Sequence, residues 1–349
     1  MPIDIHKTPK QAPAPGVSRA ATPMAFVHAI IKAYARYGMD PSQALAQAQI
    51  TPESVPDPGA RVTAAQFEAL SAFAMQQLDD EALGWFSRRL PWGTYGMLAR
   101  ASLYAPTLGV ALKRWCRHHK LIVDDLILTL SVAGDTATLS ITEIKPLGDS
   151  REFCLVSTLR FVHGYACWLL NSRITLREAC FPYAAPVHAD SVQLMFPGPV
   201  RFDAANAGFS FDSRYLDLPP ARDEAAARAM LQRALPLTVR QYTRDRLLVP
   251  RVRELLRTRP AETAQAEGLA DLLNMSRRTL HRQLAEEGAS LQALKNEVRH
   301  ELAKNLLRQT QKPIKQIAVA TGFSNEKSFL RAFRQWTGET PGDFRRRSA

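Results

Sequence analysis

The sequence lacks the motifs of the common catalytic and nucleotide-binding folds. It contains no G-x-S-x-G nucleophile elbow, no phosphate-binding P-loop and no dinucleotide-binding glycine fingerprint. These absences exclude the usual serine hydrolases, P-loop nucleotidases and Rossmann-type dehydrogenases. We therefore expect a protein that is not an enzyme and that carries no cofactor.

Cysteine is scarce, and the four cysteines form no C-x-x-C pair and lie at no finger-like spacing from a histidine. Their apolar surroundings predict buried free thiols rather than disulfides or metal ligands. The adjacent His118 and His119 would point about 100° apart on a helix, which favours surface or groove histidines over a metal pair. We expect no metal. The cysteines are Cys116, Cys154, Cys167 and Cys180.

Long apolar runs are also missing. The chain has no signal-peptide core and no apolar run near 18 residues, so we expect neither export nor a membrane span, and a cytoplasmic location. Residues 1–21 carry four prolines and no apolar period, which predicts a flexible tail.

Positive charge is present and unevenly placed. The net charge is +12, and residues 251–349 hold 19 Lys and Arg against 11 Asp and Glu, a balance of +8. Two-thirds of the excess charge thus lies in less than a third of the chain. This distribution is typical of a nucleic-acid-binding domain joined to a nearly neutral one, although a basic surface kept for solubility gives the same balance.

The N-terminal part predicts one α+β domain over residues 22–220. Helical patterns come first, with Thr63 and Thr107 as candidate N-caps. The period then changes to two on either side of Gly134-Asp135, which predicts a β-hairpin. A helix over residues 152–170, further strand-like segments and Pro219-Pro220 follow. Residues 221–250 read as a helical connector, and residues 251–349 as an all-α domain.

That all-α domain contains the same pattern twice: a short helix, a tight turn, and a second helix rich in basic and polar residues. In the first copy Ser276 is a candidate N-cap, and Leu280 and Leu284 face inward at i, i+4. The second helix then presents a basic outward face, which suits guanine edges and phosphates in a major groove. Its residues are Arg277, Arg278, His281 and Arg282.

In the second copy Gly322 permits a left-handed turn, and Ser324 or Asn325 caps the following helix. Phe329 and Phe333 face inward. Amide and ammonium groups suit base edges and phosphates, and a carboxylate can accept from a cytosine amine. The outward residues are Asn325, Glu326, Lys327 and Arg331.

A long amphipathic segment, residues 290–308, joins the two copies. As a helix it would span about 28 Å at ~1.5 Å per residue, close to the ~34 Å between successive major grooves on one DNA face. Val298, Leu302 and Leu306 form a stripe that would pack on both copies. We therefore predict two helix-turn-helix units on one rigid linker helix.

Over residues 252–347 the chain resembles the AraC/XylS family of bacterial transcription regulators. The resemblance implies that Arg278, His281 and Arg282 in the first unit and Asn325, Lys327 and Arg331 in the second touch DNA. It also implies double-stranded promoter DNA and RNA polymerase as partners, and activation more often than repression. The residues that carry the signature are Ala318, Gly322, Phe323, Ser328, Phe329, Arg331, Phe333, Gly338, Pro341, Phe344 and Arg345.

Residues 92–119 and 199–220 resemble the arabinose-binding-like sensor domain of the subgroup that includes ornithine and arginine regulators. This resemblance implies that the domain binds a small effector, forms a homodimer, or both. Aromatic residues in the two segments are candidates to line a pocket, although each can equally belong to the core. They are Trp92, Tyr95, Trp115, Phe202 and Phe209.

Two other classes of function share features with this sequence, a DNA-repair methyltransferase and a non-specific DNA-binding protein. Some DNA-repair methyltransferases join the same DNA-binding domain to a zinc-held, alkyl-accepting cysteine, but the four cysteines here offer no recognisable ligand quartet. A non-specific architectural binder would show a steep salt dependence with little sequence preference. We expect instead a sequence-specific transcription regulator that is controlled by a small-molecule effector of unknown identity. We expect this regulator to be an activator.

Overall fold

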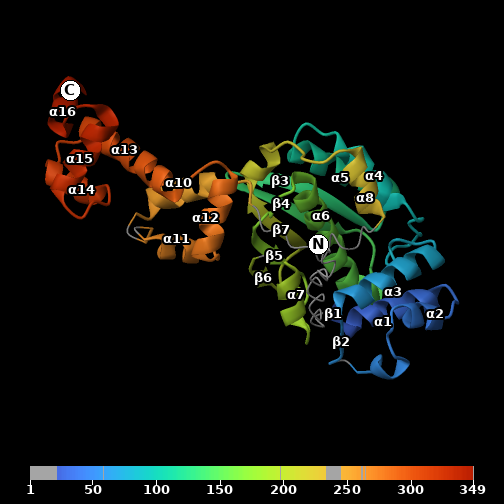
Figure 1. Cartoon of the computed structure of the whole chain (residues 1–349). Helices are drawn as coiled ribbons and strands as arrows, with labels where there is room; N and C mark the ends of the chain where they lie inside the picture. The colour runs from blue at the N-terminus through green and yellow to red at the C-terminus, as the bar shows by residue number, and fades with distance from the viewer. Residues whose placement is uncertain are drawn as a thin grey trace, which may run out of the picture. The chain divides into compact units, whose positions relative to one another are not determined.

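The computed structural model describes residues 22–57, 59–196, 198–232, 245–260, 262–263 and 265–348. The chain divides into two compact units, residues 1–242 and residues 243–349, which we call the N-terminal unit and the C-terminal unit (Figure 1). The flexible tail predicted at residues 1–21 lies outside the described residues, as does most of the connector helix predicted after Pro236.

The N-terminal unit contains a five-stranded sheet in the order β3-β4-β7-β5-β6. β3 and β4 form the predicted hairpin, which closes at Gly134 with a φ of +58°. Among the strand pairs that the structure describes, β5 with β6 is parallel and the others are antiparallel. The strands are β3 (Leu126–Ala133), β4 (Thr136–Glu143), β5 (Leu176–Cys180), β6 (Val200–Arg201) and β7 (Ala207–Asp212), and a separate short pair is β1 (Thr22–Pro23) with β2 (Arg61–Val62).

Helices pack beside this sheet, and the predicted α+β class is confirmed. The α-helices are α1 (Met24–Arg36), α2 (Ser42–Gln47), α3 (Ala64–Gln77), α4 (Thr94–Leu103), α5 (Leu108–Ile122), α6 (Arg151–Leu170), α7 (Ala189–Met195) and α8 (Glu224–Leu231), with short 3-10 turns η1 (Pro52–Ser54), η2 (Gly148–Ser150) and η3 (Ser213–Asp217).

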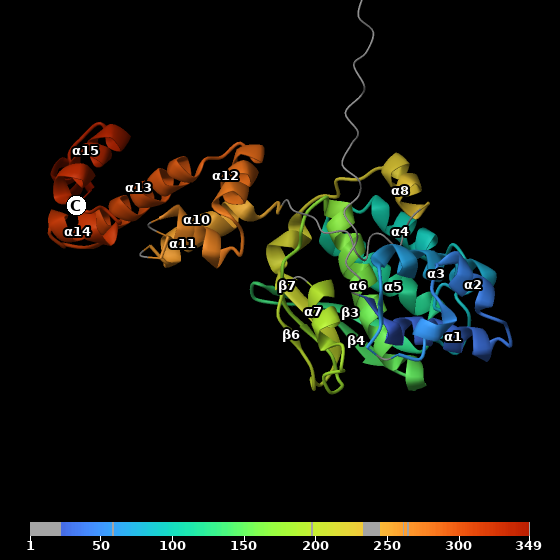
Figure 2. The same cartoon turned by 60° about the horizontal axis from the view of Figure 1, so that its bottom comes forward.

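The core of the unit forms around α6. Phe153 at one end of α6 packs against Phe26 of α1 and Phe67 of α3, while His163 contacts Phe209 of β7. In two views α6 lies between the sheet and helices α1 and α3 (Figures 1 and 2). The expectation of no apolar run near 18 residues is wrong: a window of that length within Gly148–Leu170 has a mean hydropathy of 1.3, apolar enough to cross a membrane. In the structure 89% of that window is buried, as in the core helix of a folded unit.

Local capping explains where several helices begin. Thr63 and Gln66 form a reciprocal capping box at the start of α3, and Thr107 accepts from Val110 N at α5, both as predicted. At the start of α2, Pro41 is the N-cap residue, and Asp40 accepts from Ser42 N at 3.1 Å.

Within the predicted connector, residues 221–250, the described parts fall on either side of the division between the units. α8 is capped by Asp223 and packs on α4, where Arg100 Nε lies 3.2 Å from Glu224 Oε1. The residues from Asp245 onward belong to the C-terminal unit.

The C-terminal unit is all helical, as predicted. Its helices are α10 (Leu248–Thr258), α11 (Ala266–Leu272), α12 (Arg277–Glu286), α13 (Leu291–Gln309), α14 (Ile314–Ala320), α15 (Glu326–Thr337) and α16 (Pro341–Ser348). Figure 1 shows α13 running from the group α10–α12 to the group α14–α16.

α13 belongs to two separate hydrophobic cores. Its first half buries Leu291 and Leu294 with α10, α11 and α12, and its second half buries Ala303 and Leu307 with α14, α15 and α16. The predicted stripe of Val298, Leu302 and Leu306 is half-buried. Val298 packs against the first core and Leu306 against the second, while the fully buried residues of α13 are Leu291, Leu294, Ala303 and Leu307.

Candidate nucleic-acid interface and internal pocket

The first helix-turn-helix consists of α11 and α12. Asn274 adopts a φ of +50° in the turn, and Ser276 caps α12 by accepting from Thr279 N at 3.1 Å. Leu280 and Leu284 are completely buried, as predicted. The opposite side of α12 is thereby fixed towards solvent.

All four predicted residues of α12 are exposed, but they are not equally available. Arg277 forms an ion pair with Glu267 of α11, and Arg282 Nη1 lies 2.9 Å from Glu286 Oε1 one turn along the helix. For Arg278 and His281 the described part of the chain provides no side-chain hydrogen bond or ion pair. Sequence reasoning did not foresee the two carboxylates that partner the arginines.

The second helix-turn-helix consists of α14 and α15. Gly322 adopts a φ of +80°, a conformation that favours glycine. Arg299 of α13 holds this turn: its Nη2 donates to the Gly322 carbonyl at 3.0 Å, and its guanidinium lies 5.1 Å from the centroid of the Phe323 ring. The second unit is thus fixed directly to the linker helix.

On α15 the predicted residues Asn325, Glu326, Lys327 and Arg331 are all exposed. Asn325 is the N-cap, and its Oδ1 accepts from Ser328 N at 2.8 Å. Its Nδ2 lies 3.4 Å from Ser324 Oγ and has a second N–H for a base. Lys327 and Arg331 lie on one face at i, i+4. The prediction missed Leu330, which is 39% exposed, and the exposed Arg334, both adjacent to that face.

The linker has the predicted dimensions. α13 contains 19 residues, which at ~1.5 Å each makes a rod of about 28 Å. Because residues of α13 belong to both cores, this one helix joins the two helix-turn-helix units.

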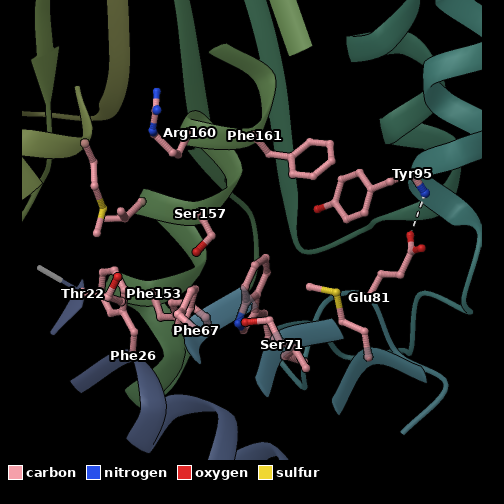
Figure 3. Close-up of a pocket in the computed structure, with 15 residues that line it drawn as sticks. Thr22, Phe26, Phe67, Ser71, Glu81, Tyr95, Phe153, Ser157, Arg160 and Phe161 are labelled. Atoms are coloured by element: carbon pink, nitrogen blue, oxygen red, sulfur yellow. Dashed lines mark hydrogen bonds between the residues drawn. The ribbon is translucent and has the colours of Figure 1, made fainter. Parts of the chain in front are cut away.

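A second candidate site lies inside the N-terminal unit. It is a cavity of about 70 Å³, several times the space that one water molecule needs. Residues far apart in sequence line it, from β1, α1, α3, the loop after α3, α4, α6 and α7 (Figure 3). Most are aromatic or aliphatic: Phe26, Phe67, Met75, Leu83, Trp85, Tyr95, Phe153, Val156, Phe161 and Met195.

Two charged side chains also line the cavity, and both are buried. Glu81 accepts from Gly93 N at 2.8 Å and from Tyr95 N at 2.7 Å, which joins the cavity wall to the start of α4 (Figure 3). Burial raises the pKa of Glu81 more than these N–H groups lower it.

Arg160 contacts a buried histidine on its own helix, with Nη1 3.1 Å from His163 Nδ1. Desolvation lowers the pKa of Arg160 to about 10 and that of His163 to about 3. Three further polar atoms of the lining are buried without a hydrogen-bond partner among the described residues: Ser71 Oγ, Trp85 Nε1 and Arg160 Nε.

Of the five aromatic residues predicted to line a pocket, Tyr95 lines this cavity. Trp92 is 48% exposed, Trp115 and Phe209 are buried in the core, and Phe202 packs on Phe181. The other lining residues come from β1, α1, α3, the loop after α3, α6 and α7, which the two resembling segments do not cover. A helical spacing of aromatic residues alone does not distinguish a cavity wall from a filled core.

The remaining candidates for metal or redox chemistry are structural. All four cysteines are free; Cys154 and Cys167 are buried, and Cys116 and Cys180 are half-buried. His119 is only 1% exposed, which corrects the expected surface histidine. It follows the buried Trp115 by one helical turn and packs on Phe86, so it faces the core. No group of three metal-ligating side chains occurs among the described residues.

Comparisons with known proteins agree with this arrangement of units. Residues 38–220 match the family "Arabinose-binding domain of AraC transcription regulator, N-term", and residues 269–347 match "Helix-turn-helix domain". The first match covers more than half of the chain.

Similar whole proteins are regulators. The chain is 29% identical over 324 residues to the ornithine utilization regulator of Pseudomonas aeruginosa, covering 93% of this chain and 96% of that one. Over 86 residues it is 36% identical to the transcriptional activator RhaS of Escherichia fergusonii, covering 24% of this chain and 31% of that one.

Among solved structures, the transcriptional regulator CdpR of Pseudomonas aeruginosa is 23% identical, with coverage of 88% of this chain and 96% of that one and a TM-score of 0.33. The named relatives are DNA-binding regulators and not enzymes, as the sequence predicts. With the double helix-turn-helix and the matched N-terminal domain, the chain belongs to the AraC family of transcription regulators.

Proposed function

We propose that this DNA-binding regulator is a transcription activator controlled by a small molecule that binds in the cavity of the N-terminal unit. The observation that carries the proposal is the cavity itself, because it combines an aromatic wall with buried charged and unpartnered polar groups. A filled structural core has no need of such groups, since each costs free energy unless something pairs with it.

On the DNA side we propose that the outward residues of α12 and α15 enter two successive major grooves. Arg278 and Arg331 suit bidentate contacts with guanine, and Lys327 suits a phosphate. Glu326 can accept from a cytosine amine. Arg277, Arg282, His281 and the side-chain amide of Asn325 complete the eight proposed contacts.

Contacts through α4 connect the cavity with α8. Glu81 holds the N-terminal end of α4, and Arg100 on α4 pairs with Glu224 on α8 at 3.2 Å. The side chain of Leu231 in α8 also lies against Gly96 of α4. A ligand that moves Glu81 would shift the population of α4–α8 arrangements, and the chain continues from α8 to the C-terminal unit.

The proposal extends to partners and location. An activator acts on RNA polymerase at a promoter, and it works in the cytoplasm, where that promoter is. A homodimer is the simplest assembly for a regulator with two units per chain. The name of the relative RhaS supports activation, and that of the ornithine utilization regulator makes L-ornithine the first effector to try.

The test begins with genomic footprinting of the full chain, which yields its operators. A reporter gene behind one operator is then transcribed with and without the chain and with candidate effectors, L-ornithine first. We expect transcription to rise when chain and effector are both present. Transcription that falls on adding the chain would refute activation, and an output that no effector from the neighbouring metabolic genes changes would refute effector control.

A further inference from the structure

The cavity of the N-terminal unit contains two side chains of opposite charge, and neither forms a salt bridge with any described residue. Glu81 is 6% exposed and Arg160 is 8% exposed. They lie on opposite sides of the cavity, Glu81 after α3 and Arg160 on α6 (Figure 3). A buried charge without a partner is costly, so such a pair is unusual in a region that serves only for packing.

Glu81 has acceptor capacity to spare. Each of its oxygens accepts one backbone N–H, from Gly93 and from Tyr95, and a carboxylate oxygen has a further lone pair. No cation lies at hydrogen-bond distance among the described residues. Asp79 and Asp80 add negative charge beside it. The group that would complete this end of the cavity is a hydrogen-bond donor with positive charge.

Arg160 has donors to spare. Its Nε is buried without a partner, and its contact with His163 is to a ring that burial keeps neutral, since the pKa of His163 is lowered to about 3. The group that would complete this end is an anionic acceptor, and a carboxylate matches the fork of a guanidinium.

Between these two ends the wall is hydrocarbon and aromatic. Phe67, Phe153, Trp85 and Phe161 line the cavity, and Phe153 and Trp85 pack edge to face with centroids 5.1 Å apart. Such a wall favours methylene groups, and ring faces also attract an ammonium group. A cavity of about 70 Å³ restricts the occupant to a small molecule.

We propose that this cavity binds a small molecule with a carboxylate at one end and an ammonium at the other, joined by a short alkyl chain. The carboxylate lies at Arg160 and the ammonium at Glu81. This inference rests on the proposed role of the cavity as the effector site, and it adds the chemical class of the ligand.

The experiment uses three probes with five carbons each: 5-aminopentanoate with both charges, pentanoate with the carboxylate alone, and pentylamine with the ammonium alone. Each is titrated into the full chain by calorimetry. Because a hydrogen bond to a charged group contributes about 1.5–3 kcal/mol, we expect 5-aminopentanoate to bind at least about tenfold more tightly than either singly charged probe.

Two variants test which charged residue binds which end of the ligand. Arg160→Met is expected to remove the advantage of 5-aminopentanoate over pentylamine, and Glu81→Gln its advantage over pentanoate. Ser157→Ala, which also changes a polar residue of the wall but no charge, is the matched control and keeps both preferences. If Glu81→Gln unfolds the unit by weakening the start of α4, Arg160→Met and the three wild-type titrations still decide the question.

The inference is overturned if a singly charged probe binds as tightly as 5-aminopentanoate, if Arg160→Met leaves the preference unchanged, or if none of the probes binds at millimolar concentration. Its failure differs from failure of the proposed function. An uncharged effector that switches the reporter would overturn this inference alone, whereas binding of 5-aminopentanoate with no change in transcription would overturn effector control alone.

Discussion

The two candidate sites of the chain present their charges in opposite ways. The C-terminal unit exposes Arg278, Lys327 and Arg331 on its recognition helices. The N-terminal unit buries Glu81 and Arg160 in the wall of a cavity. An exposed cation stays hydrated, so its free energy is low even without a binding partner. A buried charge has lost its hydration and is stabilised only when a group of opposite charge or a hydrogen-bond partner contacts it.

This difference indicates the size of each partner. Exposed cations on two helices that one rigid rod joins suit an extended polyanion such as DNA. Buried charges of both signs suit a ligand small enough to be enclosed. The same residue types therefore serve recognition of a macromolecule in one unit and of a metabolite-sized molecule in the other.

The largest effect is expected where a recognition helix meets its core. Phe329→Ala removes a fully buried ring of α15 and should destabilise the C-terminal unit by about 3–5 kcal/mol. Leu330→Ala, at the exposed neighbouring position, should change stability by less than about 0.5 kcal/mol. Calorimetric melting of the full chain would measure both. Because Phe329 lies in a core of the C-terminal unit, we expect the transition of the N-terminal unit to stay unchanged. A joint shift of both transitions would contradict this expectation.

Acid should weaken the N-terminal unit first. Burial lowers the pKa of His119 to about 4 and that of His163 to about 3, so the unfolded chain takes up protons below about pH 6.5 that the folded unit does not. Stability is then lost as the pH falls from 6.5 towards 4, by up to about 1.4 kcal/mol per pH unit for each histidine. In the C-terminal unit the lowered pKa of the half-buried His300 acts in the same direction.

Melting curves from pH 7 to pH 4.5 would measure this difference. His119→Leu is the informative variant, because both ring nitrogens of His119 are buried without a partner among the described residues. It should flatten the acid dependence of the N-terminal unit. If the melting temperature of His119→Leu depends on pH as that of the wild type does, His119 does not contribute to the loss of stability in acid.

Removing an exposed cation should cost DNA affinity and leave stability unchanged. Arg331→Ala is expected to weaken operator binding by about 1–3 kcal/mol with no shift in melting temperature. Arg282→Ala should weaken it less, because Arg282 must first give up Glu286 at 2.9 Å. Fluorescence anisotropy on a footprinted operator compares the two. A larger loss of operator affinity for Arg282→Ala than for Arg331→Ala would overturn this ranking of the two arginines.

The smallest expected effect is a gain in operator affinity. Glu286→Ala releases Arg282 and removes a carboxylate near the proposed DNA surface, so operator affinity should rise by up to about 1 kcal/mol, the scale of an exposed ion pair. The gain should shrink at high salt. Glu286→Ala in an Arg282→Ala background is the control, and an equal gain there would show that the ion pair is irrelevant.

Much of the C-terminal unit could be predicted from sequence because its signals are local. Ser276, Gly322 and the pair Phe329 and Phe333 each act within one or two helical turns, and the structure confirms all of them. What local patterns could not give is the pairing of Arg277 with Glu267, since Glu267 lies on another helix. On α13 the predicted stripe does contact both cores through Val298 and Leu306, but the residues that are most deeply buried depend on where the other helices pack.

The cavity was largely out of reach of the sequence. Its charged residues, Glu81 and Arg160, are 79 positions apart in the chain. Arg160 interrupts an apolar helical segment, which is a local signal of burial, but no local pattern connects it with Glu81. Among the predicted aromatic residues only Tyr95 lines it, because an aromatic ring packs equally well in a filled core. A cavity is a property of the assembled fold, not of any segment.

The most direct test of the account is the ratio of operator to random-sequence DNA affinity, measured for the wild-type chain and for Arg331→Ala at one salt concentration. A sequence-specific reader predicts a wild-type ratio of about 10³ or more. The variant should lose affinity mainly on the operator, so that the ratio falls by roughly five- to 150-fold. An equal loss on both DNAs would mean that Arg331 only neutralises phosphates, which would contradict direct reading of bases by α15.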